Sequence, residues 1–256
     1  NLLASLKKML KIITNHHKSG TVFWNRVLIS VNKLKKIDIF NLNNKNIISF
    51  EELLKKNHHD SLFIRDTHGL VEKYDLSGLK FLAVHSSRNA ANLIFSGSQY
   101  HMKTTEKWAN TVKKEIDNMS YKQKINSIES DEDKLIFEMT QQQNEIKRMF
   151  SLMSNPKFLS VDIDIISSDK TMKDLKVIYN HLKLSDNDID INDWLNICKK
   201  HCLWNSIPKG KGLSHITTNQ PGIYLDNRKY FFKKSREIFK DIFGEQSYKL
   251  TFEKDK

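Results

Sequence analysis

The sequence predicts an α/β fold in which a parallel sheet is flanked by helices and carries a large helical insertion. Apolar runs of strand length alternate with stretches of helical periodicity, and strands that are separated by helices form parallel sheets. The 256 residues, 39% of them hydrophobic, suffice for one sizeable core. Only three prolines and eight glycines are present, which argues against flexible linkers. We therefore expect a single domain over residues 1–256.

Each element follows from the apolar patterning along the chain. Buried strands are predicted at four short apolar runs: 9–15, 61–65, 80–85 and 157–166. Helices are predicted where apolar residues recur every three or four positions: 20–36, the stretch after 88, about 104–153, 167–184, 189–202 and about 228–243. Ser168 is expected to cap the helix within 167–184. Residues 204–226 are expected to form a loop.

The charge and the cysteines limit the class of protein. The net charge of +12 admits a polyanionic partner, but the lysines are scattered, so a solvated Lys-rich surface and no nucleic-acid partner are predicted. No apolar run approaches the roughly 20 residues of a membrane span, and lysines interrupt residues 1–13, unlike a signal-peptide core. Cys198 and Cys202, with His201 between them, match no standard zinc pattern. We expect a cytoplasmic protein with reduced thiols and no metal.

A short polar stretch joins the first predicted strand to the helix that follows it. Lys18, Ser19, Gly20 and Thr21 offer an ammonium group, two hydroxyls and backbone N–H groups at the start of a helix. Gly20 allows close approach of the backbone, so the stretch favours a phosphate or sulfate ligand. It is not a complete Walker A motif. The alternative interpretation is a simple helix cap without a ligand.

Two later stretches are expected to reach the same place. In parallel sheets, ligands bind at the carboxyl ends of the strands, where the segments 15–21, 66–69 and 85–88 all begin. Arg88 offers bidentate, charge-assisted bonds to phosphate, and the hydroxyl of Ser96, eight residues later, adds another. The alternatives are a surface ion pair for Arg88 and a packing role for Ser96.

Taken together, these stretches resemble the sulfotransferases that use 3′-phosphoadenosine 5′-phosphosulfate (PAPS), of the cytosolic type and its microbial relatives. That family carries Pro-Lys-[Ser/Thr]-Gly-Thr after a strand, and residues 17–21 read His-Lys-Ser-Gly-Thr. It carries Arg-[Asn/Asp]-Pro-x-[Asp/Glu] with a Ser eight residues after the Arg, as do Arg88-Asn89 and Ser96. Microbial relatives continue with Tyr-His, Thr, Glu and Trp, matched here by Tyr100, His101, Thr105, Glu106 and Trp108. The resemblance extends to residues 161–184 and covers most of the chain.

The resemblance implies a P-loop-like site with defined roles. Residues at the loop and helix start would hold the 5′-phosphosulfate end of PAPS: Lys18, Ser19, Gly20, Thr21 and Val22. Arg88 and Ser96 would hold the 3′-phosphate, and Phe23 would stack on the adenine unless it belongs to the core. His68, in Asp66-Thr67-His68, would be the base, and Lys18 would stabilise the bridging oxygen. The helical region at about 104–153 would lie on the acceptor side.

The chain departs from the family pattern at four points. His17 and Ala90 stand where the family has proline, and Asp66 stands where it has lysine. The late Arg-x-Gly element is missing; the nearest stretch is 215–224, and Lys209, Lys211 or Arg228 are the candidates to replace it. Part of the nucleotide clamp is therefore not assigned by the sequence.

The predicted function is transfer of a sulfuryl group from PAPS to a hydroxyl of a small molecule or glycan. One alternative is a P-loop nucleotide kinase or NTPase, with Asp162 or Asp164 as the magnesium ligand. A second is a basic nucleotide- or nucleic-acid-binding protein without catalysis, and a third is an inactive relative that binds nucleotide only. The sequence does not identify the acceptor or the oligomeric state.

Overall fold

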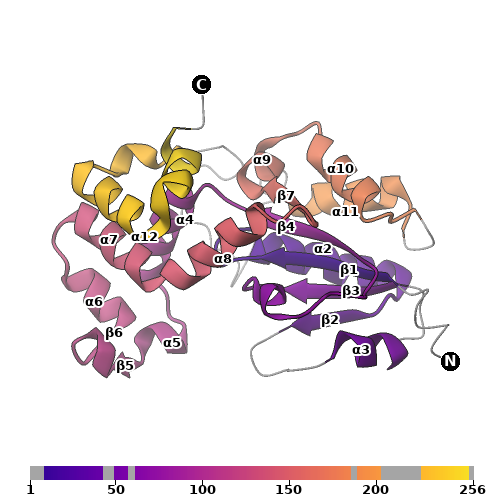
Figure 1. Ribbon diagram of the computed structural model, residues 1–256, viewed down its shortest axis with the longest axis horizontal. Helices are drawn as coiled ribbons and strands as arrows, with labels where there is room; N and C mark the ends of the chain where they lie inside the picture. The colour runs from indigo at the N-terminus through magenta and orange to yellow at the C-terminus, as the bar shows by residue number, and fades with distance from the viewer. Residues whose placement is uncertain (1–8, 43–48, 57–60, 186–188, 203–225, 254–256) are drawn as a thin grey trace.

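A five-stranded, wholly parallel sheet lies at the centre of the computed structural model, which describes residues 9–42, 49–56, 61–185, 189–202 and 226–253 (Figure 1). Its order is β2-β3-β1-β4-β7. The strands are β1 (Met9–Asn15), β2 (Ile39–Leu42), β3 (Ser61–Asp66), β4 (Phe81–Ser87) and β7 (Phe158–Asp162). The predicted α/β fold with a parallel sheet flanked by helices is confirmed. The four-residue edge strand β2 was not predicted from the sequence.

Strand β1 is central because its apolar side chains are needed on both faces of the sheet. It pairs with β3 on one side and β4 on the other, with Thr14 opposite Asp66 and His85. Ile13 belongs to the core on one face, and Leu10 and Ile12 belong to the core on the other. Strands covered on both faces read as continuous apolar runs, which is why β1 was predicted with its observed bounds.

Helices cover both faces of the sheet. One face packs against α2 (Thr21–Lys35), α10 (Lys173–His181) and α11 (Ile191–His201), with Trp24 and Trp194 fully buried between them. The other face packs against α3 (Phe50–Lys56), the turn η1 (Leu70–Lys73) and Leu152 of α8 (Gln143–Met153). Because these helices cover the two faces, the loops at the carboxyl ends of the strands lie outside this cover.

The helical insertion gathers beyond those carboxyl ends (Figure 1). It consists mainly of α6 (Tyr121–Ser127), α7 (Asp131–Gln141) and α8. Two helices from outside it, α4 (Ala90–His101) and the C-terminal α12 (Lys233–Phe252), pack with it. Helices α4, α7, α8 and α12 share one apolar core that is separate from the cores of the sheet. The insertion therefore forms a wall that faces the loops at the ends of the strands.

The prediction that residues 104–153 are wholly helical is wrong at its start. The short α5 (Lys107–Asn110) is followed by a two-stranded hairpin of β5 (Val112–Lys113) and β6 (Met119–Ser120), with η2 (Lys114–Ile116) in its turn. Asp117 and Asn118 have φ angles of 51° and 56°. Asp and Asn adopt this left-handed conformation more readily than other side chains, so their local turn chemistry ends the helical pattern.

Three other element boundaries differ from the prediction. The fourth strand ends at Asp162, whose side chain accepts a hydrogen bond from the N–H of Asp164 and starts α9 (Ile163–Ser168). Ser168 does not cap α10, because its hydroxyl donates to the carbonyl of Asp164. The last helix continues to Phe252 across a kink at Gly244, with η4 (Arg228–Tyr230) before it. Of the predicted loop at 204–226, only residue 226 lies within the described residues.

Two further features were predicted from composition. Within the described ranges, no helix is long and apolar enough to cross a membrane. Cys198 and Cys202 are free thiols in and just after α11, and both are buried. Burial raises the pKa of the Cys198 thiol, which keeps it protonated and unreactive.

Candidate active site

The candidate site lies where the strand order reverses, between β1 and β4. The chain runs from β1 to one side of the sheet and from β3 to β4 on the other side, so the loops after β1 and β4 face each other. Residues 16–20 form the first loop, and Arg88 follows β4 directly. The predicted meeting of these segments is confirmed by contact, because Arg88 Nη1 donates to the carbonyl of Lys18 at 3.3 Å.

The loop after β1 is held in shape by its own polar groups. The hydroxyl of Ser19 accepts from the N–H of His16 at 2.6 Å and donates to the carbonyl of the same residue at 3.0 Å. The side-chain amide of Asn15 donates to that carbonyl and to Thr21 Oγ1. The hydroxyl of Ser19 is therefore directed at the loop backbone, and its predicted contact with phosphate stays a prediction.

Gly20 is required at the end of this loop for two reasons. Its φ of 100° lies in the left-handed region, and a Cβ there would lie 2.9 Å from Ile163 and 3.1 Å from the hydroxyl of Ser86. Gly20 also begins α2 without any side-chain cap, so the N–H groups of the first helical turn at Thr21 and Val22 are not taken by a capping side chain. This helix start, at the end of a tight loop, is suited to an anion.

The side chain of Lys18 is buried, and its charge is not neutralised by a direct partner. Its Nζ has no hydrogen-bond partner in the part of the chain that the structure describes, and it lies 3.3 Å from the centroid of the Tyr100 ring. Burial, and then the charge of nearby Arg88, lowers the pKa of this ammonium group to about 7, against the opposing effect of Glu138 and Glu106. A negatively charged ligand at Lys18 would restore its charge.

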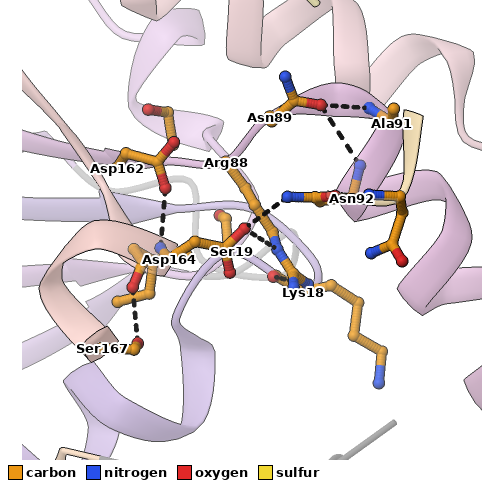
Figure 2. Close-up of polar contacts among 12 residues, drawn as sticks. Lys18, Ser19, Arg88, Asn89, Ala91, Asn92, Asp162, Asp164 and Ser167 are labelled. Atoms are coloured by element: carbon orange, nitrogen blue, oxygen red, sulfur yellow. Dashed lines mark hydrogen bonds and ion pairs between the residues drawn. The ribbon is translucent and has the colours of Figure 1, made fainter. Parts of the chain in front are cut away.

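Arg88 is fixed against the loop by a carboxylate of α9, the helix that follows β7. Its Nε donates to Asp164 Oδ2 at 3.0 Å, and the side-chain amide of Asn92 in α4 donates to the same oxygen (Figure 2). The two charged side chains are 18% and 15% exposed, so the pair is largely buried. The ion pair considered for Arg88 from sequence thus exists. It orients the guanidinium toward the loop and leaves Nη2 without a partner among the described residues.

Ser96 and Phe23 are both buried, although the resemblance assigned them contacts with a nucleotide. Ser96 is 5% exposed within α4. Phe23 is 9% exposed, packs edge to face against Trp24 at a ring distance of 4.8 Å, and belongs to the core beneath the sheet. The core role that we weighed for Phe23 is therefore observed, and the proposed contacts of both residues with a nucleotide stay predictions.

Asp66 builds the turn that presents His68. Its buried carboxylate accepts from the hydroxyl of Thr14 at 2.9 Å and from the N–H groups of His68 and Val71 at 3.1 and 2.8 Å. The departure from the family lysine thus supplies a structural carboxylate. Of the side chain of His68, 48% is exposed at the end of β3.

Sequence reasoning missed Glu145, the carboxylate that faces His68. Glu145 Oε1 of α8 lies 3.6 Å from His68 Nδ1 and accepts a hydrogen bond from the N–H of His17. The facing carboxylate of Glu145 raises the pKa of the His68 imidazole, although partial burial opposes the shift. Glu145 is 128 residues from His17, and nothing in its local sequence signals the contact.

A buried histidine pair lies beneath the loop and was also missed. His16 Nε2 and His85 Nε2 are 3.0 Å apart, and His85 Nδ1 lies 2.9 Å from the hydroxyl of Ser160. Burial lowers the pKa of His16 well below its ordinary value, with His85 adding to the effect, and lowers the pKa of His85 to about 3. The two imidazoles are therefore neutral, and one must donate a hydrogen to the other.

The remaining candidates are partly described. Burial and the neighbouring Asp164 raise the pKa of Asp162 to about 6. Among the described residues, no group of three or more His, Cys, Asp or Glu side chains is arranged to hold a metal ion. Arg228 forms a bidentate ion pair with Asp226 in η4. Lys209, Lys211 and the segment 215–224 lie outside the described residues.

Comparison with solved structures finds matches, among them a mouse sulfotransferase. No protein-family model matches the chain, and no curated protein matches it. The structure of mouse sulfotransferase SULT7A1 complexed with PAP is similar over 93% of this chain and 83% of that chain, at 14% identity and a TM-score of 0.47.

Proposed function

We propose that the protein is a sulfotransferase that uses PAPS and acts on a hydroxyl of a small molecule or glycan. The observation that carries the proposal is the contact of the Arg88 guanidinium with the Lys18 carbonyl, between residues 70 positions apart. This contact supports the assignment of the two motifs to opposite ends of one bound nucleotide. A cytoplasmic location, no nucleic-acid partner and no metal requirement belong to the same proposal.

The residues of the site fit an anionic co-substrate. Among the described residues, Lys18 Nζ has no hydrogen-bond partner and the first turn of α2 has no side-chain cap, and both features favour negative charge. The guanidinium of Arg88, which uses Nε and Nη1 in its contacts with the described residues, can donate from Nη2 to a second anionic group. When bound, PAPS would supply the activated sulfuryl group.

The proposed chemistry is divided between His68, which acts on the acceptor, and the loop after β1, which acts on the sulfuryl donor. His68 takes the proton from the acceptor hydroxyl while the acceptor oxygen forms its bond to sulfur and the sulfur–oxygen bond to the phosphate breaks. Lys18 stabilises the negative charge that develops on the leaving phosphate oxygen, and the N–H groups of the α2 start align the sulfonate. Contacts at Arg88 convert remote binding energy into alignment.

Calorimetric titration tests the proposal with 3′,5′-phosphoadenosine (PAP) beside ATP. We expect binding of PAP in preference to ATP, without magnesium, and loss of binding in Arg88→Ala. The pKa of about 7 for Lys18 predicts uptake of a proton on binding near neutral pH, since the bound anion favours the charged amine. Heats measured in two buffers of different ionisation enthalpy report that proton.

Two outcomes would contradict the proposal. Magnesium-dependent binding and turnover of ATP would favour a nucleotide kinase or NTPase. Indifference to both nucleotides, with steeply salt-dependent binding to long polyanions, would favour a nucleic-acid-binding protein. Where PAP binds, transfer from radiolabelled PAPS to a panel of phenols, alcohols and sugars distinguishes an active enzyme from an inactive nucleotide-binding relative.

A further inference from the structure

Glu145 is placed where it contacts both halves of the candidate catalytic centre. It projects from α8, on the insertion side, and its side chain is 14% exposed. The same oxygen, Oε1, accepts from the N–H of His17 at 2.5 Å and lies 3.6 Å from His68 Nδ1. One carboxylate therefore links the loop that carries Lys18 to the proposed base.

Helix α8 holds residue 68 by its main chain as well. Arg148, three positions after Glu145, donates from Nε to the carbonyl of His68 at 3.2 Å. From the opposite side, the buried carboxylate of Asp66 accepts from the N–H of His68. These two contacts fix the main chain of residue 68. Because 48% of the His68 side chain is exposed, packing alone does not fix its ring, and the Glu145 carboxylate beside Nδ1 is the polar group that can orient it.

The carboxylate also determines which nitrogen of His68 can act as the base. A carboxylate facing Nδ1 favours the tautomer with hydrogen on Nδ1, which leaves the lone pair on Nε2 to take a proton. The charged groups around the ring are Glu145 and Asp66, which favour the imidazolium, and Arg148, which opposes it, as does any charge on nearby His16.

The link to the loop depends on a departure of this chain from the family pattern. Proline has no N–H, so a proline at position 17 would leave Glu145 nothing to accept from the loop. His17 supplies that N–H, and Glu145 accepts it. The contact is therefore a property of this chain's own residues.

We propose that Glu145 is a positioning residue that fixes the orientation, tautomer and basicity of His68 relative to the Lys18 loop. The inference rests on the proposed function, because His68 matters as a base only if the site performs transfer. The contact itself can be measured without any acceptor or co-substrate.

The test uses the full chain with Glu145→Gln, Glu145→Ala and the conservative Glu145→Asp. Glu129→Gln is the matched control, since it removes one carboxylate from an exposed position of the same insertion. Proton NMR titration of the His68 ring, assigned with His68→Ala, reports the pKa. We expect the Gln and Ala variants to lower the pKa of His68, Asp to restore part of it and the control to leave it unchanged.

Activity gives the second readout. For the Gln variant, kcat at neutral pH should fall roughly 10- to 100-fold, with the acid limb of the pH profile moved to lower pH and PAP affinity unchanged. An unchanged His68 pKa in a folded Glu145→Gln protein would overturn the inference, as would a loss of PAP affinity as large as that of Arg88→Ala. If PAP does not bind the parent protein, the proposed function fails while the NMR result still decides the contact.

Discussion

Two histidine–glutamate pairs flank the same loop, and they differ in burial. His68 and Glu145 face each other at the end of β3, where their side chains are 48% and 14% exposed. His101 of α4 and Glu138 of α7 are 2.8 Å apart and wholly buried. His17 contacts both pairs, through its N–H to Glu145 and through its ring, which stacks on His101 at 5.2 Å.

The difference in burial separates a reactive pair from a structural one. Tyr121 also donates to the Glu138 carboxylate, at 2.7 Å, so one buried acid joins α4, α6 and α7. Burial, and then the charge of Glu138, raises the pKa of Tyr121 and keeps its hydroxyl a donor. The His68–Glu145 pair reaches solvent through the half-exposed His68 side chain, which the proposed transfer of a proton from an acceptor requires. The same pair of residue types, His and Glu, is thus suited to different roles on the two sides of the loop because the pairs differ in burial.

The largest expected effect separates the pairs by stability. Glu138→Ala should lower the free energy of unfolding by about 3–5 kcal/mol, because it leaves two buried polar partners without their acceptor. Glu145→Ala should cost about 1 kcal/mol, because its partners reach solvent. Urea unfolding followed by circular dichroism compares the two variants. Equal losses would show that burial does not distinguish the pairs.

The next effect concerns Lys18, a residue of the loop whose side chain contacts Tyr100 of α4. Lys18→Ala should reduce sulfuryl transfer by about 10²- to 10³-fold, the loss typical of removing one group that stabilises developing charge. Lys103→Ala, an exposed lysine just after α4, is the control and should change transfer little. Initial rates with radiolabelled PAPS measure both. Full activity in Lys18→Ala would remove the central role of this residue.

Replacing the exposed histidine should affect turnover and spare binding. His68→Ala should lower kcat by roughly 10²-fold or more while PAP affinity stays nearly unchanged, because the base acts only on the acceptor. His201→Ala is a suitable control, since His201 contacts Ser30 in α2, away from the loop. If His68→Ala instead abolished PAP binding, His68 would have a structural role.

The last effect is a pH dependence of stability from the buried histidines beneath the loop. His85 has its pKa lowered to about 3 in the folded protein, so the unfolded chain binds more protons between that value and its ordinary pKa of about 6.5. Stability should be fully present above pH ~6.5 and fall below it by up to about 1.4 kcal/mol per pH unit for this group. For His68, whose pKa is raised, the sign is opposite.

Chemical unfolding at a series of pH values measures this dependence. His85→Gln should flatten the acid side of the curve, and His68→Gln should leave that side unchanged. An acid side that is as steep in His85→Gln as in the parent protein would place the lost stability in other groups.

Local sequence determined the sheet and the loop. The apolar run of β1, the glycine at position 20 and the periodicity of α2 act between near neighbours, so each was predicted within a residue of its observed bounds. The meeting of Lys18 with Arg88 followed from the rule that parallel strands end at one edge. The hairpin at 112–120 and the end of β7 were missed because single Asp and Asn side chains override a helical or strand pattern.

Only the tertiary structure decided which carboxylate contacts which residue of the site. Asp164 orients Arg88 across 76 positions and Glu145 reaches His17 across 128, contacts that depend on how α8 and α9 pack against the ends of the strands. Periodicity shows which face of a helix is apolar, but not which of its polar side chains will meet a partner. For the same reason, identical residue types could not reveal that the pKa shifts of His68 and His85 are opposite: Glu145 raises the pKa of His68, whereas burial lowers that of His85.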